Sequence, residues 1–196
     1  MAAGMECLVL AKGKYTCSGN YLNLPKPIKI CGQGIGETIL DGFGLLIRGS
    51  KSNGSVVIQD LSIQGGTSVG LYAANGMDLI VRRCKVENFQ KQGVYAMDAH
   101  ISCDDVQVVG CGESGVYAWH TGTVKLSGEN TRIEGNVTKG DTPAGTCSHY
   151  GLRTCTASSK IQIVKPLTKE TISINNGGGG NWGGSGTIQG DGCNMQ

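Results

Sequence analysis

The chain repeats one four-residue pattern three times: Gly70-Leu71-Tyr72-Ala73, Gly93-Val94-Tyr95-Ala96 and Gly115-Val116-Tyr117-Ala118. The second copy begins 23 residues after the first, and the third begins 22 residues after the second. A set of triplets keeps nearly the same interval, and in each the first and third residues are expected to point inward: Leu61-Ser62-Ile63, Cys84-Lys85-Val86, Val106-Gln107-Val108 and Thr131-Arg132-Ile133. A fixed period of this length is typical of a solenoid, in which each repeat buries its apolar face against its neighbours.

The residues within each repeat favour strands. Short runs alternate apolar and polar residues, are rich in Val and Ile, and are separated by Gly, Asn and Asp. No window shows the apolar spacing of a long amphipathic helix. The sequence therefore predicts an all-β fold, a parallel β-helix with about 22–25 residues per coil.

The 196 residues are long enough for one domain, and the repeat leaves little room for a second. The last complete coil is predicted to hold three strands, at 150–155, 160–164 and 171–175. The 33 glycines suit a fold with several tight corners in each coil. The predicted parts are an entry cap with the first coils (6–42), regular coils (43–136), an inserted loop (137–149), a further coil (150–176) and a Gly-rich C-terminal cap or flexible tail (177–196).

Charge and hydropathy exclude several classes of function. With 17 basic and 15 acidic residues, the formal charge of +2 is too small to indicate binding to nucleic acid or to an anionic membrane. No run reaches the ~18 apolar residues that a membrane span needs. The first ten residues lack the pattern of a secretory signal, so we expect an intracellular protein or one within a particle.

The cysteines point to a reducing compartment. Their number, nine, is odd, and four of them alternate with strand residues as Val or Ile would: Cys31, Cys84, Cys103 and Cys111. We expect these four to be reduced core residues. Metal binding is the alternative, but the cysteine spacings lack the close pairs of zinc sites, so no metal and no cofactor are predicted.

With this period, the Gly-Val-Tyr openings and the Asn or Gly corners, the chain from about residue 28 to 175 resembles right-handed parallel β-helix proteins of the pectin lyase-like group. The resemblance implies a right-handed solenoid. That group includes polysaccharide lyases, polygalacturonases, alginate epimerases, phage tailspikes and non-catalytic modules, so fold alone does not fix function.

An aromatic strip is the first candidate site. If Leu71, Val94, Val116 and Leu152 point inward, alternation sends Tyr72, Tyr95, Tyr117 and Arg153 outward, in a stack with ~4.8 Å between coils. Two residues further along come Ala74, Met97, Trp119 and Cys155. Such a strip suits a sugar ring or a partner surface, because ring faces give contact area at small entropic cost. The alternative is that the stacked rings only stabilise neighbouring coils.

The second candidate is catalytic. Tyr95, Asp98 and His100 have the spacing of the Tyr-Gly-Phe-Asp-Pro-His motif of mannuronan C5-epimerases, although the Gly and the Pro are missing. The resemblance implies that Tyr95 and His100 would be an acid/base pair at C5 of a uronate, with Asp98 beside them. A cation would have to neutralise the sugar carboxylate, and Arg82, Arg83 or Lys91 could supply it.

Two further polar groups have structural explanations. Consecutive Asp104 and Asp105 are expected to diverge, and Asp105 matches Asp60 in the repeat, which favours a corner or strand-edge role. Asn75, Asp98 and His120 fall at equivalent strand ends, which predicts a ladder of turn residues beside the aromatic strip.

Our leading hypothesis is a non-catalytic recognition or scaffold module that presents the aromatic strip to a glycan or protein partner. Its solenoid ends could associate with another copy. The alternatives are a uronan lyase or C5-epimerase and a structural component of a virion or large assembly. The predicted ligand-binding residues are Tyr72, Tyr95, Tyr117, Trp119, His120 and Arg153.

Overall fold

The computed structural model describes residues 5–50, 54–140 and 148–190. Within these ranges the chain is almost entirely β-strand, with one short helix. The elements are β1 (Glu6–Val9), β2 (Gly13–Thr16), β3 (Tyr21–Leu24), β4 (Ile28–Cys31), β5 (Thr38–Asp41), β6 (Gly44–Arg48), β7 (Ser55–Gln64), β8 (Leu71–Ala74), β9 (Asp78–Glu87), β10 (Val94–Met97), β11 (His100–Val109), β12 (Val116–Trp119), β13 (Thr123–Ser127), β14 (Arg132–Glu134), β15 (Leu152–Thr154), β16 (Lys160–Ile163), α1 (Lys169–Ile172), β17 (Ser173–Ile174), β18 (Trp182–Gly184) and β19 (Thr187–Gly190).

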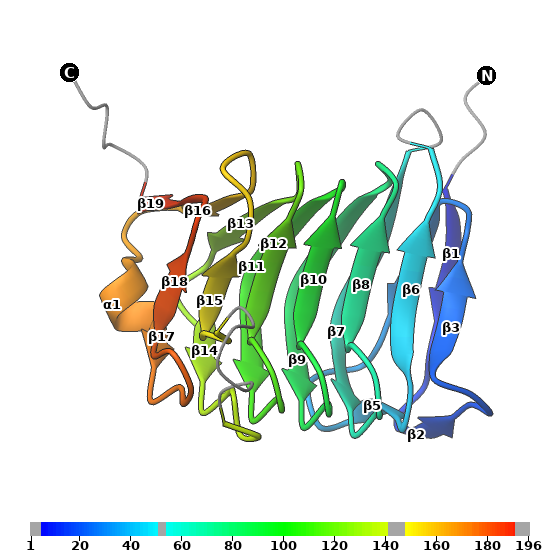
Figure 1. The fold of residues 1–196 in the computed structure, drawn as a ribbon. Coiled ribbons are helices and arrows are strands. Elements are labelled where there is room, and N and C mark those ends of the chain that lie inside the picture. The colour runs from blue at the N-terminus through cyan, green and yellow to red at the C-terminus, as the bar shows by residue number, and fades with distance from the viewer. Residues whose placement is uncertain (1–4, 51–53, 141–147, 191–196) are drawn as a thin grey trace.

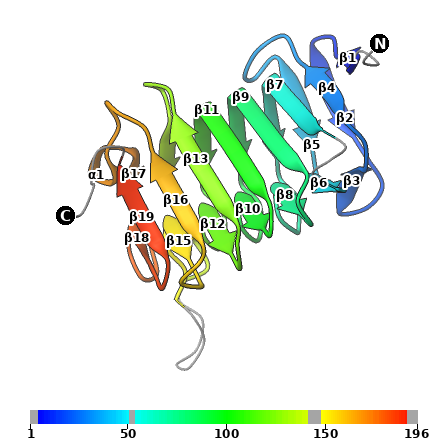
Figure 2. The ribbon, with the colours of Figure 1, turned by 90° about the horizontal axis from the view of Figure 1, so that it is seen from above.

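The strands form two parallel sheets that the chain visits alternately. In the described residues, the smaller sheet has seven strands in the order β18-β15-β12-β10-β8-β6-β3 and faces the viewer in Figure 1. The larger sheet contains the path β1-β4-β7-β9-β11-β13-β16-β19, whose outer face is seen from above in Figure 2. Apart from the strands at the two ends, each strand pairs in parallel with its equivalents in the coils before and after it, so the prediction of a parallel β-helix is confirmed.

The long strands β7, β9 and β11 bend in the middle, which gives each coil three straight segments. The bends lie at Asp60, Arg83 and Asp105, whose φ angles are 59°, 47° and 53°. Residues other than glycine rarely adopt this conformation, and Asp is among those that tolerate it best. At the first two bends a side-chain pair spans neighbouring coils, since Arg83 donates to the Asp60 carboxylate at 2.6 and 2.8 Å. The predicted corner role of Asp105 is confirmed.

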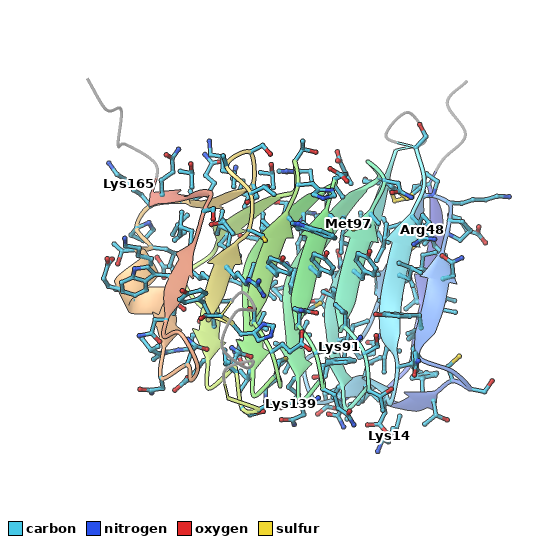
Figure 3. The ribbon with its side chains drawn as sticks, in the orientation of Figure 1. Lys14, Arg48, Lys91, Met97, Lys139 and Lys165 are labelled. Carbon is cyan, nitrogen blue, oxygen red and sulfur yellow. The ribbon has the colours of Figure 1, made fainter. Side chains whose placement is uncertain are left out.

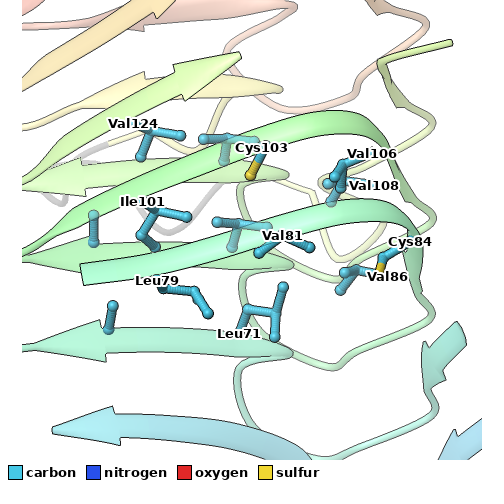
Figure 4. Packing of buried hydrophobic residues seen from close by; sticks show 14 of the residues in the cluster. Leu71, Leu79, Val81, Cys84, Val86, Ile101, Cys103, Val106, Val108 and Val124 are labelled. Carbon is cyan, nitrogen blue, oxygen red and sulfur yellow. The ribbon is translucent and has the colours of Figure 1, made fainter. Parts of the chain in front are cut away.

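Apolar side chains from both sheets fill the interior. Leu71, Leu79, Val81, Ile101 and Cys103 are fully buried and pack against one another (Figure 4). They occupy alternate positions of their strands, because every second side chain of a strand points to the same face. The first and third residues of the repeat triplets are buried as well, as the sequence predicts.

One interior column changes character along the solenoid. After the third straight segment of each coil, a turn residue with positive φ is followed by an inward position. The strand registers align Phe43, Gly66, Phe89, Cys111, Asn136 and Asn176 at this position, so the coil of Gly66 adds no side chain to the column. The column is thus apolar in the earlier coils and becomes polar toward the C-terminal end.

The C-terminal coil differs from the predicted one at a single strand. The prediction that Thr171 and Ile172 belong to a strand is wrong, because Lys169–Ile172 forms a helical turn. Thr168 caps this turn, and the Thr168 and Thr171 side chains each bond to the other's backbone amide. Further on, β18 and β19 pair with β15 and β16. Residues 182–190 therefore continue the solenoid, and residues 191–196 of the predicted cap or tail lie outside the described residues.

The first coil is open to solvent on one side. Leu8 pairs with Ile30, and Leu22 pairs with Leu45, so both leucines stand in core columns. Leu8 is nevertheless 46% exposed and Leu22 38% exposed, whereas their partners are 2% and 0% exposed.

Among the described residues, no helix has the length and apolarity that a membrane crossing requires.

Candidate functional site

The outer face of the seven-stranded sheet carries a stack of tyrosine rings. The register pairs Tyr72 with Tyr95 and Tyr95 with Tyr117 on the adjacent strands β8, β10 and β12. The ring centroids of each pair are 4.8 Å apart, and the ring planes differ by 8° and 10°. This spacing equals the distance between neighbouring strands, so the sequence period itself sets the stack. The predicted outward stack is confirmed.

The stack offers ring edges to solvent rather than ring faces. The faces of Tyr95 are covered by its two neighbours. At one end the Arg153 guanidinium lies 4.4 Å from the centroid of Tyr117, and at the other end Tyr21 is tilted by 51° against Tyr72 at 6.4 Å. The expectation that ring faces would supply contact area is therefore wrong for the tyrosines, since parallel stacking at strand spacing uses those faces internally.

Exposure decreases toward the C-terminal end of the stack. Tyr72 and Tyr95 are half-buried, but Tyr117 is only 7% exposed and Arg153 only 6% exposed. Arg153 is held by His149, whose Nδ1 lies 3.1 Å from a guanidinium nitrogen. The expectation that Tyr117 and Arg153 are exposed is wrong, because the guanidinium of Arg153 covers one face of Tyr117 and His149 in turn bonds to Arg153.

A second outward column lies beside the rings. Met97 and Trp119 are paired in register and half-buried, and the exposed Arg48 stands in the same column on β6. Figure 3 shows Met97 and Arg48 near the same border of this face. The Tyr72 hydroxyl donates a hydrogen bond to the Met97 sulfur at 3.4 Å, and the Trp119 ring centroid is 6.4 Å from that of Tyr95. Of the aromatic strip predicted from the sequence, Tyr72, Tyr95, Met97 and Trp119 are the half-buried members, and from here on the name aromatic strip refers to these four residues.

The predicted ladder of turn residues is present at the strand ends. Asn75, Asp98 and His120 all have positive φ, at 61°, 51° and 52°. His120 Nδ1 lies 3.1 Å from the Asp98 carboxylate, and Thr121 donates to the same carboxylate through its backbone amide and its hydroxyl. The His120 ring also packs on Trp119, with 4.1 Å between centroids. The ladder therefore positions one border of the aromatic strip.

Removing the His120 side chain should change the acidity of Asp98. The hydrogen bond from His120 is the main reason that the pKa of Asp98 is lowered, and the Thr121 bonds add to it. A lowered pKa in the folded state means that this carboxylate stabilises the fold at neutral pH and stops doing so as acid protonates it. We expect His120→Ala to raise the pKa of Asp98 toward its ordinary value, as measured by carbon-13 NMR titration. Thr121→Ala should raise it less, and an unchanged pKa in His120→Ala would contradict this assignment.

The predicted catalytic residues lie on two sides of a corner. Tyr95 is on β10 of the smaller sheet, Asp98 is the turn residue, and His100 begins β11 of the larger sheet. Burial, together with the neighbouring Tyr117 and Tyr72 hydroxyls, raises the pKa of Tyr95 far above its ordinary value, so Tyr95 is protonated at neutral pH. Asp98 and His100 line a groove of about 260 Å³ that is formed by Gly76, Asp78, Asp98, Ala99, His100, Thr121 and Thr123. The structure thus brings Asp98 and His100 to one groove and places Tyr95 in the ring stack.

A larger groove of about 410 Å³ crosses the outer face of the other sheet, over β7, β9, β11 and β13. It shares Asp78 and His100 with the smaller groove. We call it the Asp78 groove. Its lining is Ser55, Asp78, Ile80, Arg82, His100, Ser102, Asp104, Lys125 and Ser127.

Comparison with known families identifies the architecture. A family model described as a right-handed β-helix region matches residues 41–138, which is half of the chain. The chain belongs to the right-handed β-helix family. The predicted handedness of the solenoid is confirmed by this match.

Two solved structures resemble this right-handed β-helix at low sequence identity. They are the A-modules of the mannuronan C-5 epimerases AlgE6 and AlgE4 of Azotobacter vinelandii, with TM-scores of 0.35 and 0.34 and identities of 12% and 15%. Each alignment covers 96% of this chain and 90% of the other. Values this low carry no argument about the activity of this β-helix. No curated protein matches the chain in sequence.

The Asp78 groove of the β-helix was not predicted from the sequence. Asp78, Ile80 and Arg82 alternate along β9, and the register pairs Ile80 with Ser102 and Arg82 with Asp104 of β11. The equal positions of these residues in successive repeats were the signal from which the groove could have been predicted. Of the cations considered for the catalytic hypothesis, Arg82 lines this groove, while Arg83 is paired with Asp60. Asp104 accepts a hydrogen bond from Ser127 at 2.9 Å in the groove, and Asp105 turns away to bind Asn130. The expected divergence of the two aspartates is confirmed.

The buried cysteines of the β-helix behave as core residues. Burial raises the pKa values of Cys84, Cys103 and Cys111 to about 12, so their thiols are protonated and unreactive at neutral pH. Cys31 is half-buried. The cysteines in the described ranges form no disulfide, and those ranges contain no group of three His, Cys, Asp or Glu side chains arranged for a metal ion.

Proposed function

We propose that this β-helix is a recognition module that binds a polysaccharide along the outer face of its seven-stranded sheet. The observation that carries the proposal is the aromatic strip, in which Tyr72 and Tyr95 repeat at 4.8 Å and Trp119 and Met97 lie beside them. A ligand with its own repeat suits such a surface, because equivalent groups of the protein recur once per coil. An extended sugar chain that runs parallel to the solenoid axis is a ligand of this kind.

The chemistry of the strip favours a hydroxyl-rich ligand. The exposed edge of an aromatic ring carries partial positive charge, so ring edges attract electron-rich oxygen atoms. Met97 and Trp119 add an apolar border that suits the carbon face of a sugar ring. Arg48 stands in the same column and favours an acidic sugar, and it also opposes the effect of burial on the pKa of Tyr72.

Substitution of Trp119 is expected to weaken polysaccharide binding most. Trp119→Ala removes the largest ring at the border of the strip, and we expect the affinity to fall about tenfold, or ~1.4 kcal/mol. Tyr95→Phe removes one hydroxyl and should cause a smaller loss. The measurement is isothermal titration calorimetry with oligosaccharides of alginate, of pectate and of neutral xylan.

Two controls make this test specific. Tyr15→Phe removes a hydroxyl that bonds to the backbone of Ala11, away from the strip, and should bind sugars like the unmodified chain. Arg132→Gln alters an exposed residue of β14 on the larger sheet and should also leave binding to the strip unchanged. The proposal fails if none of the three polymers binds, or if Trp119→Ala binds as tightly as the unmodified protein.

The catalytic alternative rests on one observation, the shared groove of Asp98 and His100. It remains a prediction that the same polymers can test. Incubation with alginate and pectate would be followed by the absorbance of unsaturated products and by exchange of the proton at C5. A signal that disappears in both Tyr95→Phe and His100→Ala would replace the recognition proposal with a uronan lyase or epimerase.

A further inference from the structure

The first two coils carry two cysteines on the outer face of the larger sheet, Cys7 on β1 and Cys31 on β4. Each is next to a residue of one core column, in which Leu8 is paired with Ile30. Because side chains alternate along a strand, both thiols point away from the interior. Cys7 is exposed and Cys31 is half-buried. The prediction that Cys31 is a core residue is therefore wrong, since Ile30 occupies the inward position beside it.

The two thiols are neighbours across the strands. Lys29 is paired with Cys7 in the parallel register, and Cys31 follows Lys29 by two residues, so Cys31 is the diagonal neighbour of Cys7 on one face. Burial, and then a hydrogen bond with the Cys7 thiol, raise the pKa of Cys31. By contrast, the exposed Cys17 donates to the backbone carbonyl of Ser18 at 3.6 Å. Cys7 and Cys31 thus present two sulfur atoms at one point of the surface.

A positive charge stands beside this pair of thiols. Lys29 lies on the same outer face, opposite Cys7 and two residues before Cys31. Its charge opposes the effect of burial on Cys31 and favours the thiolate. Two thiolates that bind one monovalent cation keep a net charge of −1, which a neighbouring ammonium group offsets. The surroundings of the pair therefore favour a complex between both thiolates and a soft monovalent ion.

We propose that Cys7 and Cys31 form a binding site for Cu(I), in which the metal ion bridges the first two coils. Thiolates are soft ligands that select Cu(I), and two of them suffice for a linear complex. A structural zinc site takes four ligands, whereas in the described part of the chain no third His, Cys, Asp or Glu side chain joins this pair. Binding exchanges two thiol protons for one metal ion and changes no oxidation state.

Competition for Cu(I) tests the ligands. The reduced protein is added, without oxygen, to the coloured Cu(I) complex of bicinchoninate, and the loss of colour measures transfer of the metal. We expect Cys7→Ser and Cys31→Ser each to bind at this site at least about a hundredfold more weakly, because a single thiolate lacks the gain from two ligands on one scaffold. Cys17→Ser is the matched control and should bind like the unmodified chain. Full affinity in either pair variant, or equally tight binding of Zn²⁺, would overturn the proposal.

The charge beside the site has its own test. Lys29→Gln should weaken Cu(I) binding about three- to tenfold, since it removes the cation that offsets the charge of the complex. Lys26→Gln is the matched loss of charge on an exposed lysine before β4, and it should leave binding unchanged. Equal affinities in the two lysine variants would contradict the assigned role of Lys29.

Hydrogen exchange tests the location of the metal. β1 is an edge strand of the first coil, in which Leu8 is 46% exposed, so we expect its amides to exchange readily in the metal-free protein. Cu(I) would fix β1 to β4, and exchange of the β1 amides should slow at least about fivefold, while exchange in β12 stays unchanged. This local effect should vanish in Cys7→Ser. Unchanged exchange in β1 of the Cu(I)-loaded protein would overturn the proposal, because the metal would then be bound elsewhere.

Discussion

Gly93→Ala is expected to destabilise the β-helix by about 3 kcal/mol, because the site has no room for one added carbon. A Cβ at Gly93 would lie 2.2 Å from a methyl carbon of Val108 and 2.9 Å from the carbonyl oxygen of Gly115. The second contact is backbone of the next coil, which cannot rotate away as a side chain can. Thermal or urea unfolding of the variant measures the effect.

The reason applies to every copy of the repeated pattern. A Cβ at Gly70 would lie 2.7 Å from the carbonyl oxygen of Gly93, and one at Gly115 would lie 2.9 Å from that of Gly151. Gly190→Ala is the matched control, since its nearest atom would be the Ile163 carbonyl oxygen at an ordinary 3.8 Å. If Gly93→Ala lowered the free energy of unfolding by less than about 1 kcal/mol, neighbouring coils would have to move apart at little cost, which would contradict this explanation.

Asn136→Ala should lower the free energy of unfolding by a similar amount, about 3 kcal/mol, because buried polar groups lose their hydrogen-bond partners. The Asn136 side chain is buried, accepts from the Cys111 amide at 3.0 Å and donates to the Val108 carbonyl at 3.0 Å. It also donates to the side chain of Asn176 at 3.0 Å. Truncation leaves these groups buried without partners, each at a cost of about 1–3 kcal/mol. Urea unfolding gives the difference in free energy.

Asn130→Ala provides the comparison for Asn136. Asn130 is exposed, and its side chain makes one hydrogen bond, to Asp105 at 3.3 Å. Water can replace that bond, so we expect little change in stability. If Asn136→Ala were as stable as Asn130→Ala, the interior near Asn136 would have to admit water.

The period of the sequence was enough to predict the fold. The Gly-x-Tyr-Ala pattern marks the same strand in successive coils, and parallel register then places Tyr72, Tyr95 and Tyr117 in one column. Alternation within the triplets identifies core positions such as Cys84 and Val106, which are buried as expected. The corner role of Asp105 followed from its match to Asp60 in the repeat.

Features that depend on contacts between distant segments were not predictable in the same way. The repeat correctly placed Arg153 next to Tyr117, but it did not specify that both residues are buried or that His149 of the predicted insertion holds Arg153. The use of ring faces inside the stack depends on side-chain rotation, which a periodic pattern does not specify. The groove around Asp78 is formed across four strands, and its residues look individually like ordinary outward positions. Local capping by Thr168 overrode the strand pattern at Thr171 and Ile172.

The interior column that runs from Phe89 through Cys111 to Asn136 and Asn176 limits how the chain can be lengthened or shortened. Where the column is apolar, an additional coil must match its neighbours in size and shape but in no hydrogen bond, as Gly66 matches the ring of Phe89. The Asn136 side chain bonds to the coil before it through Val108 and to the coil after it through Asn176, so an extra coil at that point would separate Asn136 from Asn176 and leave hydrogen-bonding groups without partners. We therefore expect the fold to tolerate duplication of a coil before Cys111, in evolution or in design, and not to tolerate it after Asn136.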